Sequence, residues 1–144
     1  MLSGSSVPGY PIDQPLDLSN ADERARLTPS AIRVFVNITK KWNLAEAQAL
    51  GLLGGVSSST FHAWKKHPDG ERLEQDTLVR ISLVIGIYKA LHIYLGKPWA
   101  DRWITLPNDG LLFAGRTPIE HMLREGLPGM FEVRRMLDAW CAGH

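Results

Sequence analysis

The chain has 144 residues, of which 44% are hydrophobic and 22% charged, and its formal net charge is +1. These values are ordinary for a soluble globular protein with one domain or two small ones. A single cysteine excludes an intrachain disulfide, and the first residues lack the basic start and apolar run of a secretion signal. The longest apolar stretch contains Arg80, Lys89 and His92, which favours a buried helix over a membrane span. We therefore expect a cytoplasmic protein.

Positive charge is concentrated in the middle of the chain. Residues 29–72 carry six Lys/Arg against three Asp/Glu, whereas residues 1–28 have an acidic excess and residues 73–144 are balanced. An excess of positive charge attracts anionic partners. The distribution is a modest indication of an anionic partner for the middle segment.

Residues 1–28 are predicted to be a tail, because prolines and glycine at positions 8, 9, 11 and 15 interrupt any regular pattern. Thr28 followed by Pro29 is a helix-start signal. Apolar residues then recur at spacings of three and four up to Trp42, which predicts one face of an amphipathic helix.

The segment from Leu44 to Lys66 has the pattern of a DNA-binding helix-turn-helix of the Cro/Xre type. Asn43 is expected to cap a first short helix that ends at Gly54-Gly55, and Ser57 a second one over residues 58–66. Short hydroxyl side chains at the start of the second helix allow it to approach the major groove closely. An ordinary helical hairpin with a serine-rich turn is the alternative. Phe61 and Trp64 are expected to face inward, and double-stranded DNA is expected to meet Ser57, Ser58, Ser59, Thr60, His62, Lys65 and Lys66.

A long helix is predicted from about Leu73 to Leu95. Its apolar residues form two faces instead of one stripe, and a helix of this kind must be covered on two sides. One face consists of Leu78, Ile81, Ile85 and Tyr88, and the other of Val79, Leu83, Ile87, Leu91 and Tyr94. We expect its own domain to cover one face and a second copy of the chain to cover the other, so that Ile81, Ile85 and Tyr88 form a homodimer contact.

Three more helices are predicted after this one, so we expect an all-α fold with seven helices. A short helix at residues 98–105 is followed by an irregular loop, Thr117-Pro118 opens the next helix, and Pro128 begins the last one. The predicted organisation is a tail at 1–28, a helix-turn-helix domain at 29–70, and a C-terminal helical domain at 71–144.

No arrangement of residues predicts an enzyme. The five histidines lack the spacing of a helical metal site, and a phosphate-binding glycine loop followed by lysine is missing. Glu120 and His121 are neighbours that point in different directions on a helix, and we interpret them as a solvated pair. We predict a non-enzymatic protein with no metal and no cofactor.

Several short elements of the second half of the chain follow one another in a recognisable order. They are Arg80-Ile81, Ile87-Tyr88, Trp103, Pro107-Asn108, Gly115-Arg116-Thr117-Pro118, and Val133 to Trp140. In this order they resemble the C-terminal domain of the MbcA/ParS/Xre antitoxin family, and the helix-turn-helix upstream is similar to that of the Xre branch.

The resemblance implies a type II toxin–antitoxin system whose toxin has a RES domain and consumes NAD. Antitoxins of this family cover the entrance of the toxin's active site, and they bind the promoter of their operon as autoregulators. For a dimer, the DNA site is expected to be an inverted repeat. The alternative is a stand-alone transcription regulator whose C-terminal domain only dimerises or senses a small ligand.

The loop from Asn108 to Pro118 and the last helix are the expected toxin-binding elements. Long ordered loops often carry binding, and an arginine offers a planar fork to a carboxylate or phosphate. The alternative is that Gly115 only permits a turn and Arg116 only braces the fold. The expected toxin-binding residues are Asn108, Gly115, Arg116, Thr117, Arg134, Arg135 and Trp140.

Overall fold

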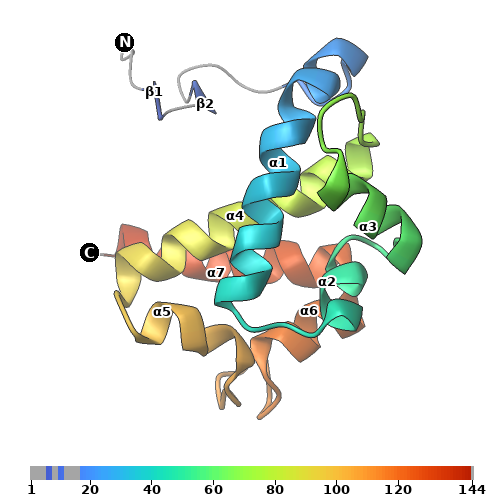
Figure 1. The fold of residues 1–144 in the computed structure, drawn as a ribbon. Coiled ribbons are helices and arrows are strands. Elements are labelled where there is room, and N and C mark those ends of the chain that lie inside the picture. Colours follow the sequence, from blue (N-terminus) through green and yellow to red (C-terminus); the bar gives the residue numbers. More distant parts are fainter. Residues whose placement is uncertain (1–5, 8–9, 12–16, 144) are drawn as a thin grey trace.

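A computed structural model of the chain describes residues 6–7, 10–11 and 17–143, and these are almost entirely helical (Figure 1). The exception is a pair of two-residue antiparallel strands, β1 (Ser6–Val7) and β2 (Tyr10–Pro11). The predicted all-helical class with seven α-helices is confirmed for the described residues. The helices are α1 (Ala21–Lys41), α2 (Glu46–Leu52), α3 (Ser58–Lys66), α4 (Gln75–Tyr94), α5 (Trp99–Arg102), the 3-10 turn η1 (Trp103–Thr105), α6 (Pro118–Glu125) and α7 (Leu127–Ala142).

Helix α4 lies at the centre of the fold, between α1 and α7 (Figure 1). By length and apolar composition alone it could cross a membrane, a test that the core helix of a soluble protein also passes. Its two apolar faces are covered inside the chain, because α1 packs on one side and α7 on the other.

We expected a second copy of the chain to cover one apolar face of α4, but α1 and α7 of the same chain cover both faces. Ile81 and Ile85 are only 1% and 8% exposed, and Tyr88 is half-buried with its ring against Trp42 and His92. These three residues pack in the core of the single chain, so the predicted contact through Ile81, Ile85 and Tyr88 is not accessible to a second copy.

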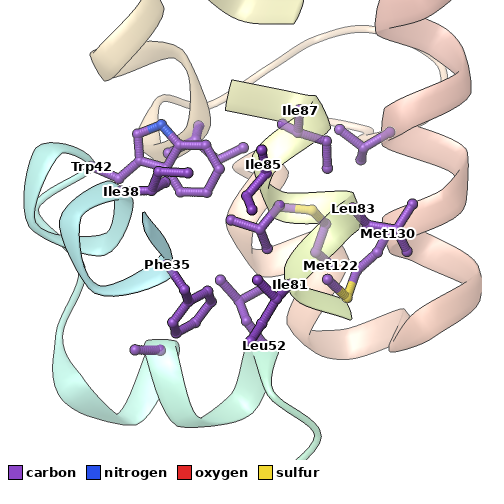
Figure 2. Close-up of a cluster of buried hydrophobic side chains, with 14 of the residues drawn as sticks. Phe35, Ile38, Trp42, Leu52, Ile81, Leu83, Ile85, Ile87, Met122 and Met130 are labelled. Atoms are coloured by element: carbon purple, nitrogen blue, oxygen red, sulfur yellow. The ribbon is translucent and has the colours of Figure 1, made fainter. Parts of the chain in front are cut away.

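One hydrophobic core joins the predicted N-terminal and C-terminal segments. Figure 2 shows side chains from α1, α2, α4, α6 and α7 meeting in a single cluster. Removing residues 1–70 would uncover the α1-facing side of α4, so functional tests of either half require point substitutions in the full chain. The labelled members are Phe35, Ile38, Trp42, Leu52, Ile81, Leu83, Ile85, Ile87, Met122 and Met130.

The predicted start of the first helix at Thr28-Pro29 is wrong. Helix α1 begins at Ala21, where the side chain of Asn20 accepts a hydrogen bond from the backbone N–H of Glu23, and Pro29 lies inside the helix. Residues 21–28 of the predicted tail are thus helical, while residues 1–5, 8–9 and 12–16 of it lie outside the described residues.

Thr28 has a tertiary role instead of a capping role. Its buried hydroxyl donates to the carbonyl of Arg24 at 2.6 Å and accepts from the backbone N–H of Leu73 at 3.1 Å. This bond fixes the segment before α4 to the middle of α1.

Replacing Thr28 with valine is expected to lower the free energy of unfolding by about 1–3 kcal/mol, because the buried N–H of Leu73 loses its acceptor. Urea unfolding measures this change. Thr39→Val in the same helix is the matched control, since the Thr39 hydroxyl only donates to the carbonyl of Val36. If both variants lower the free energy of unfolding equally, the bond to Leu73 adds no stability beyond that of a hydroxyl bonded within its own helix.

Two candidate interaction surfaces

The first candidate surface is built by α2, α3 and the turn between them, on the side of α1 away from α5 (Figure 1). The turn contains Gly54 and Gly55, both with φ of 92°, a left-handed conformation that glycine adopts without strain. The predicted Ser57 cap is confirmed, because its hydroxyl accepts from the backbone N–H of Thr60 at 3.2 Å.

The predicted Asn43 cap is wrong. Helix α2 begins at Glu46 with Ala45 in the capping position, and the side chain of Gln48 accepts from the Ala45 N–H at 2.8 Å. Asn43 itself has a φ of 56° and belongs to the turn that follows α1.

The inward side of α3 is anchored as the spacing predicted. Phe61 is buried and meets Phe35 of α1 edge-on, with ring centroids 6.2 Å apart. Trp64 is only half-buried, so it contributes less to this anchor.

All seven residues expected to contact DNA are exposed around α3, but six of them have partners within the chain: Ser57, Ser58, Ser59, Thr60, His62 and Lys65. The Ser57 hydroxyl also donates to the Thr60 hydroxyl at 2.9 Å. Lys65 holds its ammonium 4.8 Å from the centre of the Phe61 ring. The side chains of Ser58 and His62 both reach one carboxylate, that of Glu46 on α2.

Glu46 is the residue of this surface that the sequence analysis missed. One carboxylate oxygen accepts from the Ser58 hydroxyl at 2.6 Å, and the other from Nε2 of His62 at 2.7 Å. The hydrogen bonds from Ser58 and His62 hold the pKa of Glu46 below its ordinary value. An acid in the first turn of a helix was visible in the sequence, but its pairing with α3 is a tertiary contact.

A groove of about 440 Å³ runs beside α3, along α1. Its polar lining includes Arg33, Lys40 and Lys65, and Arg33 pairs with Asp69 at 3.2 Å. The positive surface of α3 therefore continues onto α1.

The second candidate surface is the loop between η1 and α6, which projects at the bottom of Figure 1. Two backbone hydrogen bonds connect Asn108 to the end of the loop. The N–H of Asn108 donates to Arg116 O at 3.1 Å, and the N–H of Gly115 donates to Asn108 O at 2.8 Å. Phe113 is buried between Trp103 and His121. The loop is therefore braced at its base and anchored by one ring, while Leu111 is fully exposed.

The residues that follow the loop support the start of α6. The Thr117 hydroxyl accepts from the N–H of Glu120 at 3.1 Å, and the Glu120 carboxylate accepts from the N–H of Thr117 at 2.8 Å. These bonds form a capping box, confirm the predicted helix start and keep the pKa of Glu120 below its ordinary value. Arg116 is half-buried and its Nε donates to Phe113 O at 3.4 Å, so it braces the loop.

The three predicted toxin-binding residues of α7 differ in their surroundings. Arg134 lies directly over Gly86 of α4 and pairs with Asp138 at 2.9 Å. Trp140 is half-buried, with its ring near Tyr94 and Trp103. Arg135 is exposed. Arg134 and Trp140 thus support helix packing, and Arg135 is the residue of the three most open to a partner.

The described residues form no group of three or more His, Cys, Asp or Glu side chains placed to hold a metal ion.

The interpretation of Glu120 and His121 as a solvated pair is wrong for the histidine. His121 is buried, and its Nε2 lies 2.9 Å from the Glu132 carboxylate of α7, while Glu120 caps α6.

Comparison with known proteins places the second surface within a recognised domain. Residues 89–143 match the antitoxin Xre/MbcA/ParS C-terminal toxin-binding domain. The whole chain is similar to the uncharacterized protein y4oB of Sinorhizobium fredii (strain NBRC 101917 / NGR234), at 34% identity over 131 residues that cover 90% of this chain and 98% of the relative.

Residues 89–143, from the end of α4 through α7, are thus a toxin-binding domain of the antitoxin type, and this class supports a non-enzymatic, regulatory protein. The chain belongs to one family with y4oB, and its C-terminal part is a domain of the Xre/MbcA/ParS antitoxin type. The resemblance seen in the sequence is confirmed for this domain, and the domain supports a general role in a toxin–antitoxin system with a toxin as partner.

Proposed function

We propose that this protein is the antitoxin of a type II system and neutralises a RES-domain toxin that consumes NAD. The match of residues 89–143 to a toxin-binding domain carries the proposal. The braced loop with the exposed Leu111 offers a rigid element to insert at the entrance of the toxin's active site. Occlusion of this kind requires no catalytic group and no cofactor, only an ordered surface that displaces substrate.

We further propose that α2 and α3 form a helix-turn-helix that binds promoter DNA of the operon. The N-terminal end of α3 carries exposed hydroxyl groups, and its last turn carries Lys65 and Lys66. This distribution suits a helix whose start meets base edges while its end meets phosphates. Such a repressor acts in the cytoplasm.

An inverted-repeat site requires a homodimer, and its contact cannot be the buried face of α4. The exposed apolar side chains at the end of α4 and the start of α5 are the better candidates, with Ile93 76% and Trp99 53% exposed.

The decisive experiment is to express the chain together with the product of the neighbouring reading frame. We expect a RES-domain neighbour, a stable complex of the two proteins, preserved cellular NAD and growth, and a shift of promoter DNA by the complex. A neighbour that forms no complex, combined with promoter binding by the chain alone, would favour a stand-alone transcription regulator. Binding to neither would refute both functions.

A further inference from the structure

The Glu46 carboxylate is placed where the proposed DNA interface should tolerate negative charge least. It lies at the first residue of α2, its side chain is 43% exposed, and both of its partners belong to the first half of α3. The hydrogen bonds it accepts favour the ionised form, so a negative charge persists at neutral pH.

DNA offers such a carboxylate two kinds of neighbour. Phosphates and base acceptors repel it, and they are present at every sequence. Exposed amino groups attract it, and in the major groove these are the N4 amino group of cytosine and the N6 amino group of adenine. A carboxylate at this position thus weakens binding to most sequences and weakens it least where an amino group faces it.

We propose that Glu46 is a specificity-determining residue of the DNA interface, whose carboxylate accepts a hydrogen bond from a base amino group in the major groove. Ser58 and His62 hold the carboxylate in place from α3, so it is oriented before DNA arrives. This inference rests on the proposed DNA-binding function and assigns one base position to a residue outside the predicted recognition set.

A purely structural role is the competing explanation, in which Glu46 only fastens α2 to α3. Glu46→Gln separates the two, because glutamine keeps an acceptor for Ser58 and removes the charge. Asp69→Asn is the matched control, since it removes one negative charge from the exposed carboxylate that pairs with Arg33, away from the Glu46 cluster.

The experiment selects binding sites from random-sequence duplex DNA with the full-length wild-type protein, E46Q and D69N. Affinities are then measured for the enriched duplex and for a scrambled duplex. We expect E46Q to lose preference at one cytosine or adenine position, to bind the scrambled duplex more tightly, and to reduce the affinity ratio about tenfold. D69N should keep the wild-type preference.

Three outcomes would overturn the inference. If E46Q enriches the wild-type site with an unchanged affinity ratio, Glu46 does not determine specificity, although DNA binding stands. If E46Q and D69N change the ratio equally, the effect is one of net charge alone. If the wild type enriches no sequence and binds no duplex, the proposed DNA-binding function fails as well. Thermal unfolding of each variant shows whether the fold is retained.

Discussion

Replacing Leu111 with aspartate is expected to release the toxin from inhibition. Leu111 is fully exposed on a loop that is closed by backbone bonds between Asn108 and the segment at residues 115–116 and anchored by Phe113. A rigid apolar side chain of this kind binds without a large ordering cost, whereas a carboxylate buried at the same interface is desolvated without a partner. We expect roughly 100-fold weaker binding to the purified toxin and loss of growth rescue.

Two further variants show whether the effect belongs to the loop. Leu111→Ala removes the apolar contact without adding charge and should weaken binding less than L111D does. Ala25→Asp adds the same charge at an exposed position of α1 and should leave toxin binding unchanged. All three should bind promoter DNA and unfold thermally as the wild type does. Toxin binding by L111D at wild-type affinity would exclude the loop tip from the interface.

The two Thr-Pro pairs of the chain show which features the sequence predicts and which it does not. Thr117-Pro118 opens α6, where Glu120 completes a capping box three residues after Thr117. Thr28-Pro29 carries the same local signal but lies within α1, because Asn20 caps the helix earlier. What the Thr28 hydroxyl does instead, accepting a hydrogen bond from the N–H of Leu73, links positions 45 residues apart in sequence, and no local pattern contains such a contact.

The same limit applies to the candidate surfaces. The Ser57 cap, the inward Phe61 and the loop before α6 follow from local spacing and turn chemistry, and the structure confirms them. The pairing of Glu46 with α3 and the position of Arg134 over Gly86 arise only when separate helices pack together. The two apolar faces of α4 were recognised correctly, but the sequence did not reveal that α1 and α7 cover both.

Replacing Lys65 and Lys66 together with alanine is expected to weaken promoter binding for all sequences alike. Both lysines are exposed in the last turn of α3, and Lys65 continues the positive surface that includes Lys40 of α1. Each lysine that neutralises a phosphate contributes about one to the slope of log affinity against log salt concentration. The double variant should therefore lower the slope by about two and reduce affinity roughly 30-fold near physiological salt.

The measurement is a titration of promoter DNA and of a scrambled duplex at several salt concentrations. Because Lys65 lies over the Phe61 ring, its loss can also loosen α3, and Lys66→Ala alone tests the charge without that contact. Arg124→Ala, on α6, is the matched control for removing one exposed positive charge. A salt slope that is the same for wild type, K66A and the double variant would show that the end of α3 does not meet the phosphate backbone. In that case the groove along α1 would be the next candidate for the anionic partner.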